Sequence, residues 1–222
     1  MDLRCLVVPE CSNSIQSDLF TWKRYSVGRA RLHRALEERP TLDPTLRWRP
    51  FQLQPDMPAE GRDFRTVLEQ KFGSWTRAEQ MFDRIRTLGN ELDLDFQFDA
   101  IEVAPNTADA HRLVLWAAEQ DQGDRMATAL FRAYFSEGRN VSDPAVLVGC
   151  AEDAGLDADA ARSLLEGNDY AEAVRESQQQ AQRKGITGVP CYVFDDEHAL
   201  TGAQSVDVFV EALDTVQAES AK

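Results

Sequence analysis

The sequence predicts a mixed α/β protein in which one long all-helical segment interrupts a small β-sheet. Two observations support this prediction. Short runs of β-branched and aromatic residues stand near both ends of the chain, and such residues favour strands. Between these runs, apolar residues recur at the three- and four-residue spacing of amphipathic helices. The chain has 222 residues, 43% of them hydrophobic, which is enough to bury one substantial core.

Residues 1–64 are expected to form a strand, a helix and a second strand. An apolar run at 3–8 predicts a short buried strand, and the apolar positions of 28–38 predict a helix. Residues 46–53 alternate between apolar and polar side chains, which predicts a strand that is weakened by Pro50. Two strands joined by one helix are expected to pair in parallel through a right-handed crossover.

Residues 65–184 are nearly all helical in pattern and are expected to form an insertion subdomain. Two helix starts are marked clearly. Asn106 or Thr107 is a typical N-cap, and Ser142-Asp143-Pro144 combines a cap with proline in the first turn. Gly89-Asn90 is a typical helix end. An unstructured connection of this length is rare, so the helices are expected to pack together.

Residues 185–222 return to strand composition. The segment 189–194 is β-branched and aromatic, which predicts a strand. The polar stretch from Asp195 to His198 predicts a turn, and 199–201 would form the second strand of a hairpin. Ser205 would cap a final helix. These residues are therefore expected to complete the sheet begun by the first region.

The charge balance excludes two classes of partner. The formal net charge is -14 and the isoelectric point is about 4.6. Such a surface repels nucleic acid phosphates and anionic lipid head groups, so neither is an expected partner. The amino-terminal residues show no basic segment followed by a long apolar run, and no window approaches the length of a membrane span. We therefore expect a cytoplasmic protein.

The cysteines do not form a recognisable site. The four cysteines are Cys5, Cys11, Cys150 and Cys191, and no two of them stand three positions apart, so the sequence holds no C-x-x-C pair. Together with three scattered histidines they lack the spacing of zinc ligands, and no metal is expected. Their irregular spacing in a chain of this size does not imply a disulfide framework.

A proline segment near the carboxyl end carries the clearest family likeness. Gly185-Ile186-Thr187-Gly188-Val189-Pro190 resembles the turn and cis-proline that open the third strand of DsbA-like thioredoxin-fold proteins. Further segments resemble the FrnE-type branch of that family, often called dithiol-disulfide isomerases, at 50–58, 106–112, 130–143 and 193–204. These matches stand in the family's order between Gly28 and Leu213. The resemblance implies a thioredoxin fold with a large helical insertion.

The resemblance fails where the family's active site is expected. Relatives carry C-P-W-C at the start of the first helix, where one thiolate attacks a disulfide and the second thiol resolves the mixed disulfide. Here Thr21-Trp22-Lys23-Arg24-Tyr25-Ser26 stands at that place, so activity of that kind is expected to be weak or lost. Three explanations stay open: a natural loss that leaves a binding or isomerase site, a shifted reading frame near the amino end, or substitution by the remaining cysteines.

Thr21 and Ser26 are the candidates for the position of the missing nucleophile. The related glutathione-dependent 2-hydroxychromene-2-carboxylate isomerases use a serine at the first position to hold the glutathione thiolate, so Ser or Thr is compatible with function. A simple helix cap explains either residue equally well. Trp22 would line a substrate groove or cover the core.

Pro190 is the strongest single candidate, because a proline in a tight turn lacks an N–H and leaves neighbouring backbone groups free for a substrate. Val189 would then offer its N–H and C=O by strand-like pairing. Cys191 follows directly, so its thiol would lie at the rim of the site, or would pack in the core as free cysteines often do. Cys11 would approach Cys191 only if it lies near the end of the first strand.

Asn106 and His111 are the candidates on the helix that resembles the family's N-T-x-x-A-H-R segment. Both are expected to contribute to substrate binding if that helix faces the cleft. Capping explains Asn106 without any ligand, and a lone histidine on a helix is more often a packing or surface residue than a functional one.

The resemblance implies a thiol-disulfide oxidoreductase or isomerase that acts on a disulfide-containing protein or on glutathione. One alternative is a glutathione-dependent isomerase with Ser26 or Thr21 near the thiolate. The other is a peptide-binding module without enzyme activity that uses Val189 and Pro190. Glutathione would serve as a co-substrate and no other cofactor is expected; a homodimer is compatible with each of these functions.

Overall fold

A computed structural model describes residues 2–7, 18–42, 44–52, 54–90, 95–186, 190–195 and 198–220. It describes the backbone alone at positions 2–7, 18–26, 45, 46, 88 and 220. The central sheet has four strands in the order β2-β1-β5-β6. Its strands are β1 (Asp2–Val7), β2 (Thr45–Pro50), β5 (Cys191–Phe194) and β6 (His198–Thr201).

The strand pairing confirms the predicted topology. β1 runs parallel to β2 and antiparallel to β5, and β5 and β6 form an antiparallel hairpin. The crossover from β1 to β2 is α1 (Asp18–Glu37). The prediction that this helix starts at Gly28 is wrong. The apolar side chains before Gly28 lack regular helical spacing, which hid the helix, but no helix-breaking residue stands between Asp18 and Gly28. β2 ends at Pro50 rather than at position 53, as expected of a residue that cannot donate to a neighbouring strand.

The middle of the chain is helical, as predicted. Its helices are α2 (Phe64–Phe72), α3 (Trp75–Asn90), α4 (Ala108–Ala118), α5 (Gly123–Phe131), α6 (Pro144–Asp153), α7 (Ala158–Glu166) and α8 (Ala171–Arg183). A π-helical turn, η2 (Arg132–Ser136), follows α5 directly. Sequence patterns missed this turn, the 3-10 turn η1 (Phe98–Ala100) and the short antiparallel pair β3 (Arg62–Asp63) and β4 (Val103–Ala104).

The predicted helix signals are present in the structure. α3 ends at Asn90. Asp143 is the N-cap of α6, accepts a hydrogen bond from the Ala145 N–H at 2.8 Å, and is followed by Pro144. Thr107 is the N-cap of α4 by backbone geometry. These local signals depend on hydrogen bonds within a few residues, which is why sequence alone located them.

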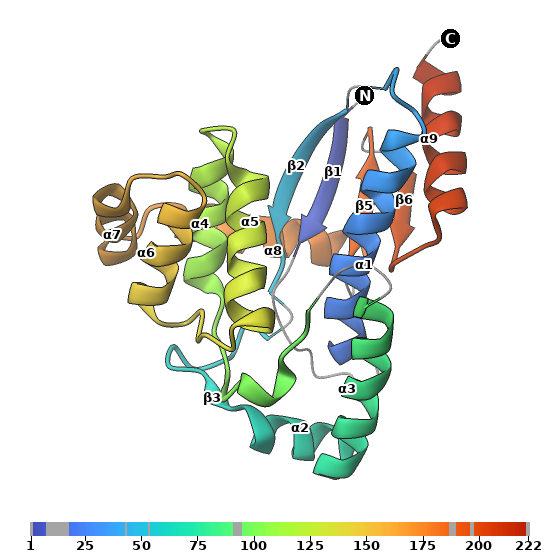
Figure 1. Cartoon of the computed structure of the whole chain (residues 1–222). Coiled ribbons are helices and arrows are strands. Elements are labelled where there is room, and N and C mark those ends of the chain that lie inside the picture. The colour runs from blue at the N-terminus through green and yellow to red at the C-terminus, as the bar shows by residue number, and fades with distance from the viewer. Residues whose placement is uncertain are drawn as a thin grey trace.

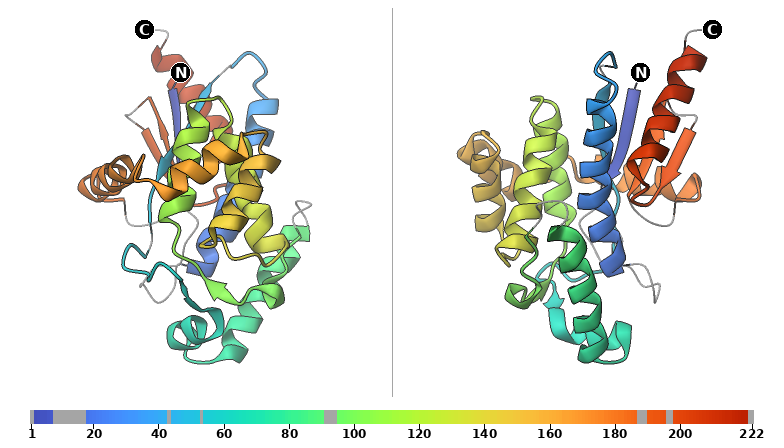
Figure 2. Two further views of the ribbon diagram at one scale, coloured as in Figure 1. Left: turned by 90° about the vertical axis from the view of Figure 1, so that its left-hand side faces the viewer. Right: turned by 45° about the vertical axis from the view of Figure 1, so that its right-hand side comes forward.

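The helices cover the sheet in layers (Figure 1). α1 and α9 (Val206–Ser220) lie on one face of the sheet and α8 lies on the other. The block of α4 to α7 stands beside β2, and α1 lies between this block and α9 (Figure 2). α2 and α3 lie beyond one end of the sheet, where α3 contacts α1.

The two faces of β5 show how the sheet is buried. Tyr192 packs edge-on against Phe209 of α9, with 4.9 Å between the ring centroids. Its neighbours Cys191 and Val193 point the opposite way and pack with Ala181 of α8 because successive strand residues face opposite sides of a sheet. All four β5 residues are buried, so this strand lies in the centre of the protein.

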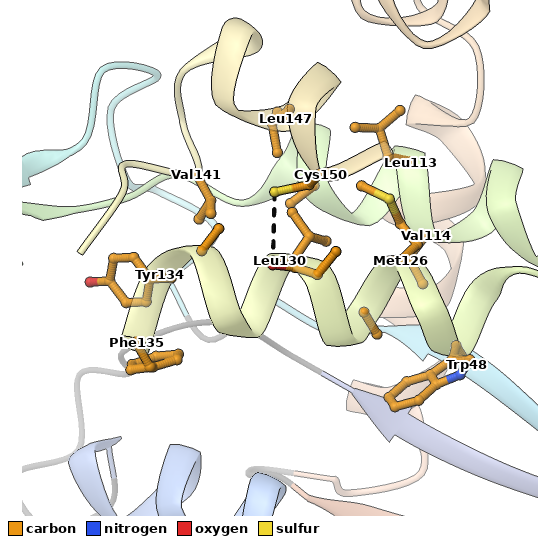
Figure 3. Close-up of a cluster of buried hydrophobic side chains, with 14 of the residues drawn as sticks. Trp48, Leu113, Val114, Met126, Leu130, Tyr134, Phe135, Val141, Leu147 and Cys150 are labelled. Carbon is orange, nitrogen blue, oxygen red and sulfur yellow. Dashed lines mark hydrogen bonds between the residues drawn. The ribbon is translucent and has the colours of Figure 1, made fainter. Parts of the chain in front are cut away.

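One cluster of buried apolar side chains extends from the sheet into the helical block. Figure 3 shows this continuity along α5: Trp48 of β2 lies near one end of the row, Met126 and Leu130 lie in the middle, and Tyr134 and Phe135 lie at the other end. The helical region therefore shares its core with the sheet.

Candidate functional site

Pro190 lies against α1 in the folded chain. Its Cγ atom is 3.4 Å from the point where a Cβ at Gly28 would lie, and the hydroxyl oxygen of Tyr192 is closer than 3.0 Å to the same point. A side chain at Gly28 would displace one of these neighbours. The glycine thus permits a close approach between the proline segment and the helix.

The strand register places Pro190 at a defined end of the sheet. Leu6 of β1 lies opposite Cys191, and Val7, the last residue of β1, lies opposite Pro50 of β2. Pro190 precedes Cys191, so it lies at the carboxyl end of the parallel pair β1 and β2. Open α/β sheets bind their ligands at this end of their parallel strands.

Two contacts hold the Pro190 segment in place. The Pro190 carbonyl accepts a hydrogen bond from the Gly202 N–H at 2.8 Å. The guanidinium of Arg31 on α1 donates to the carbonyls of Ala203 at 3.0 Å and Gln204 at 3.3 Å. The loop after β6 therefore links the proline segment to the helix. Val189 lies outside the described residues, so its backbone groups cannot be placed.

The predicted serine and threonine positions lie within α1. Thr21 and Trp22 belong to its first turns, Ser26 lies further in, and only their backbone is described. The alternative explanation, that Thr21 or Ser26 caps the helix, is wrong, since both lie inside α1 (Asp18–Glu37). Backbone N–H groups beyond the first turn of a helix are used in internal hydrogen bonds, so Ser26 lacks the free N–H groups that stabilise an anion.

On α1, the ring of Pro190 lies beside Gly28, well inside the helix. Gly28 is seven residues beyond Thr21, and at 1.5 Å per residue this separates them by roughly 10 Å along the helix axis. The sequence had predicted that the proline segment faces the start of the first helix. In the structure it faces the helix interior, because α1 extends further toward the amino terminus than expected.

The two cysteines whose side chains are described are buried. Cys191 is 1% exposed and faces α8, away from α1, and burial raises the pKa of its thiol. The prediction that it lies at the rim of the site is therefore wrong. Cys150 is also fully buried, its sulfur lies 3.8 Å from the Ala129 carbonyl (Figure 3), and burial raises its pKa to about 11. Disulfide exchange requires a thiolate, so neither cysteine is suited to it at neutral pH. Cys11 lies outside the described residues.

Asn106 has a structural role. Its side-chain amide donates to the Met57 carbonyl at 2.6 Å, and its side-chain oxygen accepts from the Ala108 N–H at 2.9 Å. Its own N–H donates to the Ser142 hydroxyl at 2.8 Å. These bonds tie the start of α4 to two neighbouring loops. The expectation that Asn106 binds substrate is therefore not supported by its contacts.

His111 is buried in α4 at 2% exposure. Burial lowers the pKa of its imidazole to about 3, so the ring is neutral at physiological pH. Its Nε2 atom has no hydrogen-bond partner among the described residues. Arg112, the next residue, has such partners: its guanidinium donates to the carbonyls of Leu164, Gly167 and Asp169.

The comparisons with known proteins agree with this architecture. The family model of the DSBA-like thioredoxin domain matches residues 26–214. This chain belongs to the DsbA-like thioredoxin family. The crystal structure of the probable DsbA oxidoreductase SCO1869 from Streptomyces coelicolor superposes with a TM-score of 0.85 at 28% identity, covering 99% of this chain and 91% of that one.

Two further relatives are known by sequence. The Bacillus subtilis protein YwbO is 27% identical to this DsbA-like chain over 192 residues, which cover 86% of this chain and 90% of YwbO. The 2-hydroxychromene-2-carboxylate isomerase of Sphingobium xenophagum is 35% identical over 83 residues, 37% of this chain and 43% of the isomerase. The likeness to the isomerase is therefore regional.

Sequence reasoning missed an ion pair near the site of this DsbA-like protein. Arg29 on α1 and Asp124 on α5 form two hydrogen bonds, at 3.1 and 2.5 Å. His33, one turn further along α1, has its pKa lowered by burial and by the charge of Arg29. The pair joins α1 to the helical block. No local pattern signals a contact between residues so far apart in the sequence.

The described part of the chain shows no group of His, Cys, Asp and Glu side chains that could hold a metal ion. Among the described helices, none combines the length and the apolar character needed to cross a membrane.

Proposed function

We propose that this DsbA-like protein binds glutathione at the Pro190 segment and that its own disulfide exchange is weak or lost. The observation that carries the proposal is the contrast between the two parts of the site. Pro190 is held against α1 at the ligand-binding end of the sheet, whereas Cys150 and Cys191 are buried and have raised pKa values. The sequence has no C-x-x-C pair that could supply the thiolate instead.

Glutathione fits this contrast because it brings the missing thiol. As a short extended peptide it can pair with backbone groups as a strand does, and Val189 would be the residue that offers them. Reduced glutathione is abundant in the cytosol, which agrees with the expected cytoplasmic location. A disulfide-containing protein is the other ligand that the family resemblance implies.

A glutathione-dependent isomerase is the second candidate function. It is favoured by the 35% identity with the Sphingobium isomerase. In such a reaction the glutathione sulfur adds to the substrate and leaves again, so no oxidant or reductant is consumed. This electron balance suits a site without redox-active cysteines of its own. Thr21 would lie nearest the free N–H groups of α1 that could stabilise a bound thiolate.

Calorimetric titration with reduced glutathione tests the proposal. We expect saturable binding that Pro190→Ala weakens at least tenfold, because the proline ring restricts the backbone of the segment that would pair with glutathione. Pro144→Ala is the matched control, since Pro144 is exposed in the first turn of α6 and its change should leave binding unaltered. Absence of binding to the wild-type protein, or equal effects of the two variants, would refute the proposed site.

Activity assays separate the candidate functions. Insulin reduction with glutathione or dithiothreitol is expected to proceed no faster with the protein than without it. Isomerisation of 2-hydroxychromene-2-carboxylate that requires glutathione would establish the second candidate. Insulin reduction that survives Cys191→Ser would show exchange by another thiol and contradict the loss of redox activity. Binding of extended peptides but not of glutathione would instead indicate a peptide-binding module.

A further inference from the structure

Arg31 on α1 binds the loop that follows β6. Its guanidinium donates to the backbone carbonyls of Ala203 at 3.0 Å and Gln204 at 3.3 Å, which stand 172 and 173 positions further along the chain. Hydrogen bonds from a charged donor are shorter and stronger than those between neutral groups. One side chain therefore fixes two successive residues of this loop.

The partners of Arg31 differ from those of its neighbours. Arg29 pairs with Asp124 of α5, and Arg39, just after α1, pairs with Asp214 of α9. Carboxylates are plentiful, since the chain has 38 Asp and Glu residues. In the part of the chain that the structure describes, Arg31 nevertheless pairs with backbone carbonyls and with no carboxylate. Its charge therefore acts on the position of a loop.

The loop that Arg31 binds also holds Pro190. The Gly202 N–H donates to the Pro190 carbonyl at 2.8 Å. This bond adds one more pair to the hairpin of β5 and β6, in which Cys191 lies opposite Thr201. Gly202 has a φ of 80°, which glycine adopts without strain, and the chain turns there from β6 to the residues that Arg31 binds.

Pro190 and the loop pack on the same part of α1. The Cγ atom of Pro190 and the Cα atom of Ala203 each lie 3.4 Å from the point where a Cβ at Gly28 would lie. Gly28 and Arg31 are three residues apart, so they lie on the same face of the helix. One face of α1 thus provides both the surface beneath Pro190 and the donor that holds the loop beside it.

We propose that Arg31 is a positioning residue for glutathione. By binding Ala203 and Gln204 it fixes the loop at Gly202, and the Gly202 N–H in turn fixes the Pro190 segment at which glutathione would bind. The inference rests on the glutathione site proposed above and requires no contact between Arg31 and the ligand. Without Arg31 the segment would have to be ordered when the ligand binds, which lowers affinity.

Amide hydrogen exchange, followed by NMR without any ligand, tests whether Arg31 holds the segment. In Arg31→Gln the Gly202 N–H should exchange about tenfold faster than in the wild type, because the loop opens more often. The amides of Leu113 and Leu213, which are fully buried in α4 and α9, should keep their rates. A general loss of stability would accelerate all three amides, so this comparison separates positioning from a contribution to stability alone.

Calorimetric titration with reduced glutathione tests the effect on binding. Arg31→Gln should weaken binding about fivefold, because the segment is no longer held ready for the ligand. Arg34→Gln is the matched control, since Arg34 is exposed on the same helix and its replacement removes the same charge; it should leave binding unaltered. Arg31→Lys keeps a charged donor for the loop and should restore part of the affinity.

Four results would overturn the role of Arg31. They are an unchanged Gly202 exchange rate in Arg31→Gln, equal acceleration at Leu113 and Leu213, glutathione binding that Arg31→Gln leaves unchanged, and an equal loss of binding in Arg34→Gln. A wild-type protein that binds no glutathione would instead refute the glutathione site itself. The two failures are therefore distinguishable.

Discussion

The close approach at Gly28 predicts a destabilising substitution and its suppressor. A Cβ at position 28 would lie closer than 3.0 Å to the hydroxyl oxygen of Tyr192, so at least one of them must move. Tyr192 is fully buried and packed edge-on against Phe209, 4.9 Å away, so it has little room to yield. Inserting extra atoms in a packed core costs about 1–3 kcal/mol.

Helix propensity acts in the opposite direction. Alanine is better than glycine inside a helix by about 1 kcal/mol, so Gly28→Ala should be destabilising by roughly 0–2 kcal/mol in total. Gly149→Ala is the matched control, because the nearest atom to its Cβ is the flexible guanidinium end of Arg139 at 3.1 Å. That variant should be stabilised by up to about 1 kcal/mol.

Tyr192→Phe should suppress the defect. With the hydroxyl removed, the nearest atoms to a Cβ at Gly28 are the Ala203 Cα and the Pro190 Cγ, both at the ordinary distance of 3.4 Å. Tyr192→Phe alone should cost about 1 kcal/mol for the lost polar interactions. It should also remove the penalty at Gly28 and so give a favourable coupling of about 1–3 kcal/mol in a double-mutant cycle.

Urea unfolding of the wild type, the two single variants and the double variant measures this coupling. Two results would refute the reasoning. One is Gly28→Ala as stable as Gly149→Ala, which would mean that Tyr192 does not occupy the space. The other is additive effects of Gly28→Ala and Tyr192→Phe, which would mean that the two residues do not touch.

Three further predictions follow from buried groups. Arg112→Leu should lower the free energy of unfolding in urea by about 3 kcal/mol, because three carbonyls lose their buried donor. Arg175→Ala removes only an exposed ion pair within a helix and should cost less than about 0.5 kcal/mol. Equal costs would contradict the role of Arg112. Cys150 and Cys191 should resist iodoacetamide at pH 8 in the native protein and react in urea, since burial raises both thiol pKa values. Peptide mapping identifies which cysteine is labelled. Rapid labelling of either in the native protein would contradict its burial. Burial lowers the pKa of His111 in the folded protein to about 3, against 6.5 for the free side chain, so the unfolded state takes up a proton first as the pH falls. The free energy of unfolding should therefore decrease by up to about 1.4 kcal/mol for each pH unit lowered from 6.5 to 3. An unchanged pH slope in His111→Gln would refute this origin.

Local patterns anticipated much of the helical region. The cap at Asp143 and the helix start at Asn106 or Thr107 were predicted correctly, because each depends on residues adjacent in sequence. The start of α1 was misplaced since its apolar residues before Gly28 do not repeat regularly. The π-helical turn after α5 has no sequence pattern comparable to a cap. Periodicity therefore located most helices but not their irregularities.

The candidate site was predicted less well than the fold. Pro190 was chosen from its resemblance to the family segment, and the structure places it against α1. For Cys191 the sequence left the rim and the core open, and the alternation of β5 turns its side chain into the core beside α8. Asn106 was assigned to substrate, but two of its hydrogen bonds join the start of α4 to the loops at Met57 and Ser142. Which way a side chain points depends on strand register and on partners far along the chain.

The sequence by itself determined the order of helices and strands, the proline segment and the absence of a C-x-x-C pair, because each is written in residues that are close together along the chain. Only the tertiary structure decided that Pro190 lies beside the interior of α1 and that the Nε2 of His111 is buried without a hydrogen-bond partner among the described residues. Those features depend on the register of β1 with its neighbours and on the packing of α4 and α5 against β2, which bring distant residues together.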